Sequence, residues 1–129
     1  MPEFSSTSRG QLMTCHDDLI RLFVEVVKEF DCKIIIGHRI KWEQDEAFKD
    51  KMSKVKWPNS LHNKYPSRAV DVIPYPVDWK DEDRNHMFGG YVLGVAKQLR
   101  IRVRWGHDWN KNKKLDDQKF IDSPHYELY

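Results

Sequence analysis

The stretch from residue 19 to residue 30 limits the fold more than any other part of the sequence. Apolar side chains recur there at steps of three and four, whereas Arg21, Glu25 and Lys28 fall on the other side. The apolar positions are Leu19, Leu22, Phe23, Val26, Val27 and Phe30. Because an α-helix turns once every 3.6 residues, this pattern predicts a helix with one buried face. Thr14 followed by Asp17 predicts that the helix starts near Thr14.

Four short segments predict a sheet against which that face can pack. Residues 33–37 are mostly β-branched and end in Gly, residues 69–75 are stopped by Pro74 and Pro76, and residues 101–105 alternate apolar side chains with Arg. Residues 125–129 are expected to form a last short strand. Such runs are typical of half-buried or buried strands, and proline ends a strand because it has no N–H to donate.

Two more helices are predicted, at residues 42–52 and 81–100, and residues 53–68 and 106–124 are expected to be loops. On the later helix the predicted apolar stripe is Met87, Tyr91, Val95 and Leu99, and the glycines expected to allow close packing are Gly89, Gly90 and Gly94. This order of elements predicts an α+β fold with a small, largely antiparallel sheet flanked by helices. The 129 residues suffice for a single domain, residues 1–129, of which about the first 12 are expected to be a flexible segment.

Composition excludes several classes of protein. No apolar run approaches the roughly 18 residues of a membrane span, and the sequence starts without a secretory signal, so we expect cytoplasmic synthesis and no membrane insertion. Lys and Arg total 22 against 20 Asp and Glu, a net charge of +2 that is too balanced to indicate nucleic-acid binding. Cys15 and Cys32 have no CxxC spacing and are expected to be free thiols.

Three residues at predicted strand ends or in adjoining loops carry groups suited to zinc: His62, Asp71 and His125. Two imidazoles and one carboxylate are a ligand set that leaves a fourth position for water. Spacing alone does not establish the site, because the chain has six His residues and long loops fold in many ways. The alternative for Asp71 is a surface position on an ordinary strand.

Asp122 lies three residues before His125, with Pro124 between them. A carboxylate there can accept a proton from an attacking water and pass it to the leaving amine, a contribution of about 10²- to 10⁴-fold. The alternative is that Asp122 caps a turn before Ser-Pro.

Four ordered motifs resemble one family of zinc peptidases. They are "GHR" followed by Gln44, "SLHNKYPSRAVDVIPYPVDW", "RWGHDW" and "DSPHYEL". The similarity as a whole runs from about Leu19 to Leu128. The family comprises D-Ala-D-Ala carboxypeptidases and L-alanyl-D-glutamate endopeptidases, and the sequence is most similar to its phage endolysin branch. The resemblance implies that His62, Asp71 and His125 bind Zn²⁺ and that Asp122 is the catalytic acidic residue. It also implies that Arg39 binds substrate and stabilises the oxyanion, and that Gln44 takes part in substrate binding.

The function implied by this resemblance is hydrolysis of an amide bond in the peptidoglycan stem peptide, by a monomer that reaches the cell wall after another protein opens the membrane. The resemblance does not separate endopeptidase from carboxypeptidase. An alternative from another class is a non-catalytic cell-wall or nucleic-acid binding module, suggested by the basic and aromatic residues in "KVKWPNS" and "IRVRW". His107 either lines the cleft or is a loop residue, and Asp108 and Trp109 are expected to hold their loop together.

Overall fold

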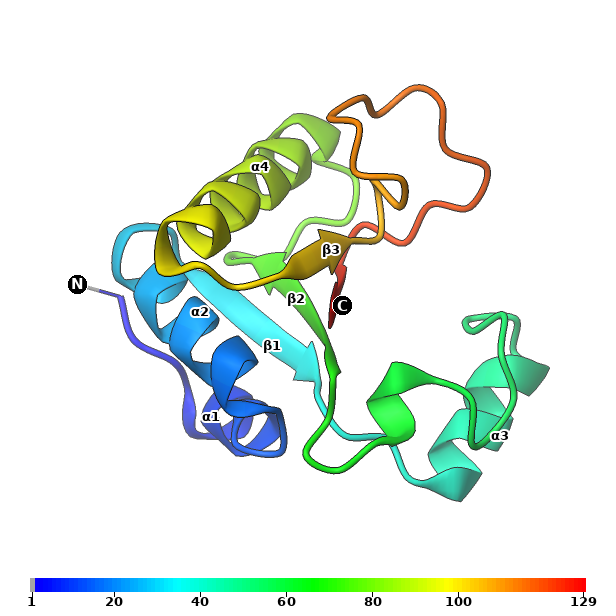
Figure 1. Cartoon of the computed structure of the whole chain (residues 1–129). Coiled ribbons are helices and arrows are strands. Elements are labelled where there is room, and N and C mark those ends of the chain that lie inside the picture. The colour runs from blue at the N-terminus through cyan, green and yellow to red at the C-terminus, as the bar shows by residue number, and fades with distance from the viewer. Residues whose placement is uncertain (1) are drawn as a thin grey trace.

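The computed structural model describes residues 2–129 as four α-helices, one 3₁₀ turn and four strands (Figure 1). In chain order the elements are α1 Ser6–Leu12, α2 Asp17–Glu29, β1 Cys32–Ile36, α3 Lys41–Lys49, the turn η1 Leu61–Asn63, β2 Ala69–Pro74, α4 Glu82–Leu99, β3 Val103–Trp105 and β4 His125–Leu128. The strands lie in the order β1-β2-β4-β3, and each neighbouring pair is antiparallel. The predicted α+β class with an antiparallel sheet is therefore confirmed.

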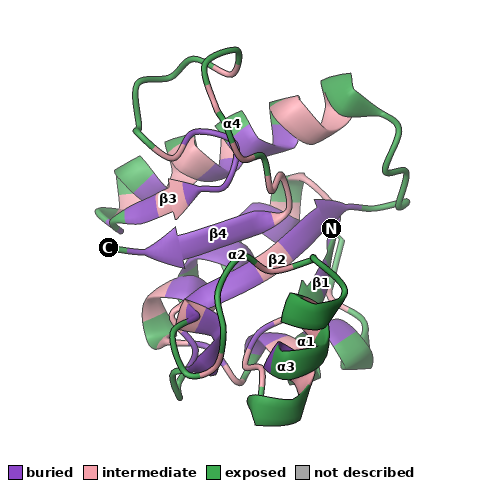
Figure 2. Cartoon of the chain, turned by 90° about the vertical axis from the view of Figure 1, so that its right-hand side faces the viewer, coloured by how far each residue is buried: buried purple, intermediate pink, exposed green. Residues whose placement is uncertain are grey.

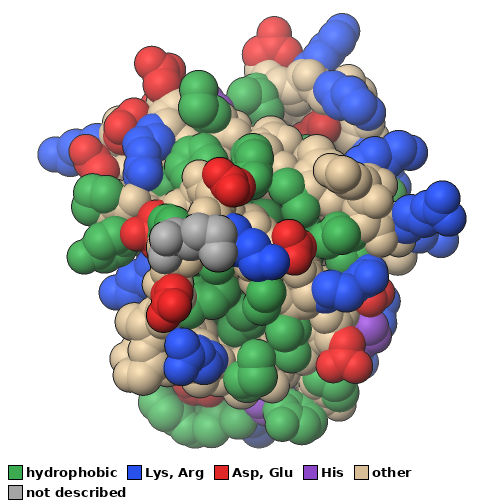
Figure 3. Space-filling model, turned by 90° about the vertical axis from the view of Figure 1, so that its left-hand side faces the viewer, with side chains coloured by type: hydrophobic (Ala, Val, Ile, Leu, Met, Phe, Trp, Pro, Cys, Tyr) green, Lys and Arg blue, Asp and Glu red, His purple; other side chains and the backbone are tan. Residues whose placement is uncertain are grey.

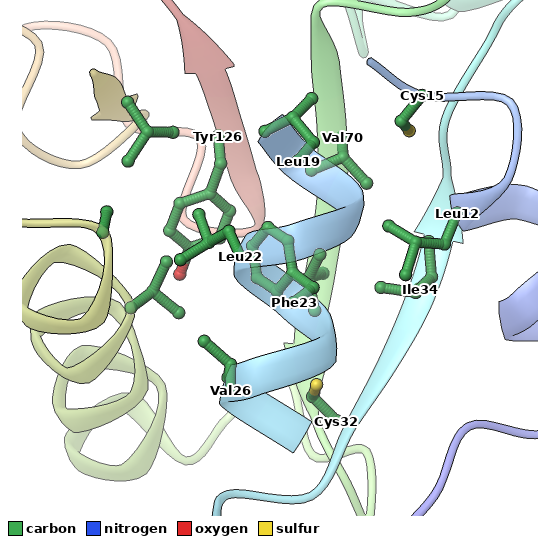
Figure 4. Packing of buried hydrophobic residues seen from close by; sticks show 14 of the residues in the cluster. Leu12, Cys15, Leu19, Leu22, Phe23, Val26, Cys32, Ile34, Val70 and Tyr126 are labelled. Atoms are coloured by element: carbon green, nitrogen blue, oxygen red, sulfur yellow. The ribbon is translucent and has the colours of Figure 1, made fainter. Parts of the chain in front are cut away.

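Alternation along the strands divides the sheet into two faces of different chemistry. Val70 and Val72 of β2 and Tyr126 of β4 belong to the hydrophobic core, together with the buried face of α2 (Figure 4). Asp71 lies between Val70 and Val72 in sequence, and His125 directly precedes Tyr126. Because successive side chains of a strand point to opposite faces, these polar side chains lie on the side away from the core. Figure 2 shows this side, where β2 and β4 are not covered by a helix.

The predicted face of α2 is confirmed, but its start is not at Thr14. Leu19, Leu22, Phe23, Val26 and Val27 are all buried. The helix begins at Asp17, and the N-cap is His16, whose Nδ1 accepts a hydrogen bond from the N–H of Asp18. The Thr14 hydroxyl instead donates to the carbonyl of Gln11 and accepts from the N–H of His38. A long-range hydrogen bond from the segment after β1 therefore engages the side chain that the local pattern assigned to the cap.

The buried face of α4 is offset by one residue from the predicted stripe. Phe88, Val92 and Ala96 are buried, whereas Met87 is 69% exposed. Gly89 explains the orientation, because a Cβ at this position would lie 2.2 Å from the Trp105 ring. The helix thus approaches β3 through its glycine, while Gly90 and Gly94 face open space.

Residues 6–12, which the sequence analysis includes in a flexible segment, form helix α1 and pack on β1. Leu12 is buried in the core, and the Ser8 hydroxyl accepts a hydrogen bond from the N–H of Ile34 at 3.1 Å. The flexible-segment prediction is therefore wrong for these residues. No local pattern predicted helix α1, because the strand on which it packs lies more than twenty residues away in the sequence.

One face of the molecule carries side chains of mixed type. On the side shown in Figure 3, basic and acidic side chains are interspersed among hydrophobic ones. Among residues 2–129, none of the helices combines the length and apolar character needed to cross a membrane. Cys15 and Cys32 are both buried free thiols, as predicted.

Candidate active site

Three of the predicted site residues meet on the open face of the sheet. His62 comes from η1, Asp71 from the middle of β2 and His125 from the first position of β4. Asp71 and His125 are direct partners in the β2–β4 register. One ligand atom from each of the three residues lies within 4.8 Å of the others. The closest approaches are 3.1 Å from His62 Nε2 to Asp71 Oδ1 and 3.2 Å from His125 Nδ1 to the same oxygen.

Local hydrogen bonds explain why the loop before β2 presents His62 to the sheet. The Ser60 hydroxyl accepts from the N–H of His62, and the Asn63 side chain accepts from the N–H of Ser60. The carbonyl of His62 accepts from the N–H of Arg39 at 2.8 Å. The predicted loop at residues 53–68 therefore contains one rigid turn, which is tied to the segment that follows β1.

The outer nitrogen of each imidazole has its own partner. His62 Nδ1 lies 2.7 Å from the carbonyl oxygen of Gly37, and His125 Nε2 lies 2.7 Å from Glu127 Oε1. The Gly37 carbonyl can only accept a hydrogen bond. Burial would raise the pKa of Glu127, but the hydrogen bonds and charges of His125 and Arg104 lower it by more, so Glu127 is ionised and also accepts. The outer nitrogens therefore carry protons, and each ring in its neutral form directs its lone pair towards Asp71, from His62 Nε2 or from His125 Nδ1.

This arrangement fits a bound divalent cation. Two nitrogen lone pairs and a carboxylate oxygen that converge on one point repel one another unless a cation or extra protons lie between them. Imidazole nitrogen and carboxylate oxygen are common zinc ligands, and a ligating His usually donates its other N–H to a carbonyl or carboxylate. His62 and His125 both follow that pattern.

The electrostatics of the cluster oppose the effects of burial. Burial alone would raise the pKa of Asp71, but His62 and His125 hold it well below its ordinary value. Burial alone would lower the pKa of His125, but the hydrogen bonds with Asp71 and Glu127 raise it to about 9. The Asp71 carboxylate and the His125 imidazolium therefore stabilise each other's charge, and a divalent cation that displaces the proton from His125 Nδ1 can take over that role.

Asp122 lies beside this cluster. Its Oδ2 is 3.9 Å from His125 Nδ1, and its side chain is 29% exposed. The turn from Asp122 to His125 is held by the backbone, since the carbonyl of Asp122 accepts from the N–H of His125 at 3.0 Å. Burial, followed by the charge of Asp71, raises the pKa of the Asp122 carboxyl. Gly106 permits this geometry, because a Cβ there would lie 2.2 Å from the carbonyl oxygen of Asp122.

Arg39 and Gln44 are joined, but only Arg39 reaches the open surface near the cluster. Arg39 Nη1 donates to Gln44 Oε1 at 2.9 Å. Gln44 itself is 0% exposed, and its amide donates to the Ser53 hydroxyl and to the carbonyl of Val55. The structure thus places Gln44 behind Arg39, where it connects α3 to the following loop and is shielded from a ligand.

A cleft of about 1210 Å³ passes over the cluster and extends beyond it on both sides. On the side of α3 its walls include Arg39, Lys54 and Val55, and on the side of α4 they include Trp79 and His86. Its floor contains Asp71, Asp122, His125 and Glu127. The space is large enough for an extended peptide.

The loop after β3 forms one wall of the cleft. The Asp108 carboxylate accepts from the N–H groups of Asn112 and Lys113, and the Trp109 indole donates to the carbonyl of Phe120. The loop-holding role predicted for Asp108 and Trp109 is thereby confirmed. His107 is buried in the same wall, where its Nδ1 lies 3.1 Å from the Ser123 hydroxyl oxygen and its ring contacts His86.

Sequence reasoning missed Glu127 and its partner Arg104. Glu127 Oε2 accepts from Arg104 Nη2 at 2.7 Å while Oε1 faces His125. The two-residue period of a strand could have identified Glu127, because it follows His125 by two positions and therefore lies on the same face of β4.

Comparisons with known proteins identify the class: they support a peptidase that cleaves peptidoglycan. The family model described as phage L-alanyl-D-glutamate peptidase matches residues 2–129, and the chain belongs to this family. Among solved structures, it is similar to the Serratia marcescens L-Ala D-Glu endopeptidase ChiX, with 25% sequence identity and a TM-score of 0.76. That match covers 98% of this chain and 90% of ChiX. A comparison with curated proteins gave no significant match.

Proposed function

We propose that the chain is a zinc-dependent endopeptidase that hydrolyses the L-Ala–D-Glu bond of the peptidoglycan stem peptide. Both the family description and the similar Serratia structure carry this specificity, and neither carries a carboxypeptidase activity. The carboxypeptidase reading of the sequence is therefore the less supported of the two. The observation on which the proposal depends most is the convergence of His62, Asp71 and His125 within 4.8 Å.

In this proposal the three convergent residues hold zinc through His62 Nε2, His125 Nδ1 and the Asp71 carboxylate. Zinc bound there supplies a Lewis acid that polarises the scissile carbonyl and lowers the pKa of water to about 7. Glu127 and the carbonyl of Gly37 keep the two imidazoles in the tautomers that this requires. The protein thus presents its ligands with their lone pairs already directed inward.

Asp122 is proposed to move the proton. Its Oδ2 accepts a proton from the attacking water and then delivers it to the amine that leaves from D-Glu. The raised pKa of the carboxyl, caused by burial and by Asp71, favours such an exchange at a pH nearer neutrality. The position of Oδ2 beside His125 supports this role over that of a turn cap.

Arg39 is proposed to bind a carboxylate or the developing oxyanion of the substrate. Its backbone is fixed through His62, and its guanidinium is directed by Gln44. A cation held in this way stabilises negative charge without reorganising during the reaction. Gln44 would then affect the substrate through Arg39, as a positioning residue.

We further propose the role of a phage endolysin that acts as a monomer on the cell wall after release through the membrane. The family to which the chain belongs supports the site of action.

Two variants test the function against a non-catalytic binding module. His62→Ala should lose both zinc and hydrolysis, whereas Asp122→Asn should retain about one zinc per chain and lose hydrolysis. Zinc is measured by elemental analysis of the purified protein, and products from purified peptidoglycan are identified by mass spectrometry. New N-terminal D-Glu is the expected product, and full lytic activity in Asp122→Asn would remove the proposed role of that carboxylate.

A further inference from the structure

The two ends of the cleft differ in charge. Among the residues that line it, the Lys and Arg side chains are Arg39 and Lys54, and both lie on the side of α3. Lys54 Nζ lies 5.1 Å from the centre of the Phe120 ring on the opposite wall. The end next to α4 has no lining Lys or Arg among the described residues and includes the carboxylate of Glu82. The cleft can therefore distinguish an acidic half of a substrate from a neutral half.

The α4 end combines an exposed aromatic side chain with free polar groups. Trp79 lines this end and its side chain is 57% exposed. Glu82, Asn85 and His86 of α4 line the same cleft, and the Asn85 amide also donates to the carbonyl of Asp78 at 3.4 Å. Within residues 2–129, no side-chain hydrogen bond is made by Trp79, Glu82 or His86. These groups remain available to a ligand that has both an apolar face and hydrogen-bonding substituents.

The proposed substrate has two halves that match these ends. After the scissile bond, D-Glu contributes an additional carboxylate, which complements Arg39 and Lys54. Before it, L-Ala is attached to the amino sugar of the glycan strand, which is a neutral ring with hydroxyl and acetamido groups. The C–H face of a pyranose can pack on an indole while its polar groups bond to carboxylate, amide and imidazole side chains.

We propose that Trp79, Glu82, Asn85 and His86 form a subsite for the amino sugar that carries the stem peptide. This inference rests on the proposed function. The D-Glu half then extends towards Arg39 and Lys54, so the orientation of the substrate across the sheet is defined. Trp79 supplies the apolar contact, Glu82 accepts from hydroxyl groups, and Asn85 and His86 bond to the acetamido group or ring substituents.

The test compares two substrates that share the peptide and differ in the sugar. One is N-acetylmuramyl-L-alanyl-D-glutamyl peptide, and the other is the same peptide with a simple N-acetyl group in place of the sugar. Trp79→Ala should lower kcat/KM about tenfold on the sugar-bearing substrate and leave the acetyl peptide unchanged, as expected for the loss of one aromatic contact. The matched control is Trp42→Ala, because Trp42 is 63% exposed on α3 and does not line the cleft.

A second variant guards against an indirect effect of the tryptophan on folding. Glu82→Gln is nearly isosteric at an exposed position and should also lower activity on the sugar-bearing substrate alone. Equal losses on both substrates, or equal behaviour of Trp79→Ala and Trp42→Ala, would overturn the subsite. Wild-type protein that cleaves neither substrate would overturn the proposed function itself, so the two failures are distinguished.

Discussion

Replacing Glu127 by Ala tests the geometry of the proposed metal site without removing a proposed ligand. The carboxylate lies 2.7 Å from His125 Nε2 and 2.7 Å from Arg104 Nη2, and its side chain is 11% exposed. It holds the proton of the imidazole on Nε2 and thereby leaves the Nδ1 lone pair facing Asp71. We predict that Glu127→Ala weakens zinc binding because the ring loses this orientation and part of its basicity.

The expected size of the effect follows from the one hydrogen bond that His125 loses. A hydrogen bond to a charged group contributes about 1.5–3 kcal/mol, and 1.36 kcal/mol corresponds to a factor of ten. Zinc should therefore bind about 10- to 150-fold more weakly, which agrees with the roughly 10- to 100-fold loss typical of such outer partners. Glu127→Gln retains an acceptor oxygen for His125 and should lose less than about tenfold.

The affinity is measured by equilibrium competition with a chromogenic chelator, and circular dichroism checks that each variant is folded. Glu25→Ala is the matched control, because Glu25 lies on α2, pairs with Lys28 at 2.8 Å and is distant from the cluster in the fold. If Glu127→Ala bound zinc as tightly as wild type, packing against Trp109, whose ring centre is 5.5 Å from that of His125, would suffice to orient the imidazole. The reasoning about tautomers would then be refuted.

Three further predictions concern stability and metal dependence. Burial raises the pKa of Cys32 from 9.0 to about 12, so the stability contributed by the neutral thiol is complete below pH 9 and is lost as the pH rises towards 12. In urea unfolding over that range, wild type should lose up to about 1.4 kcal/mol per pH unit more than Cys32→Ala, and parallel curves would contradict this. Gly89→Ala should lower the free energy of unfolding by about 1–3 kcal/mol through its clash with Trp105, whereas Gly94→Ala should raise it by about 0.5–1 kcal/mol. Thermal melts of both variants provide the check. Removal of zinc by a chelator should abolish peptidoglycan hydrolysis and added zinc should restore it; hydrolysis that survives complete removal of metal would exclude the proposed zinc chemistry.

The elements of this fold were predictable where local periodicity decides the structure, as in α2 and the four strands. The face of α4 was not, because two adjacent rows of that helix both carry apolar residues at a spacing of four. The close approach of Gly89 to Trp105 decides between the rows, and that contact joins distant parts of the chain. Helix α1 was missed for the same reason, since its Ser8 bonds to β1.

The proposed ligands were predicted by a resemblance of motifs, whereas their convergence depends on tertiary structure. Asp71 and His125 are 54 positions apart and meet only through the β2–β4 register. Gln44 matched a motif, but a motif does not reveal that the side chain is fully buried behind Arg39. Glu127 could have been predicted, because side chains two positions apart in a strand share a face and Glu127 lies two positions after His125.

Since β2 and β4 carry hydrophobic side chains on one face and reactive ones on the other, neither strand can change on one side without disturbing the other. A substitution at Tyr126 that shifts the backbone would move His125 and Glu127 with it. We therefore expect related enzymes to acquire new substrate preferences through the segments that border the cleft, at residues 50–60 and 107–124, while the two central strands tolerate little change in either their packing or their length.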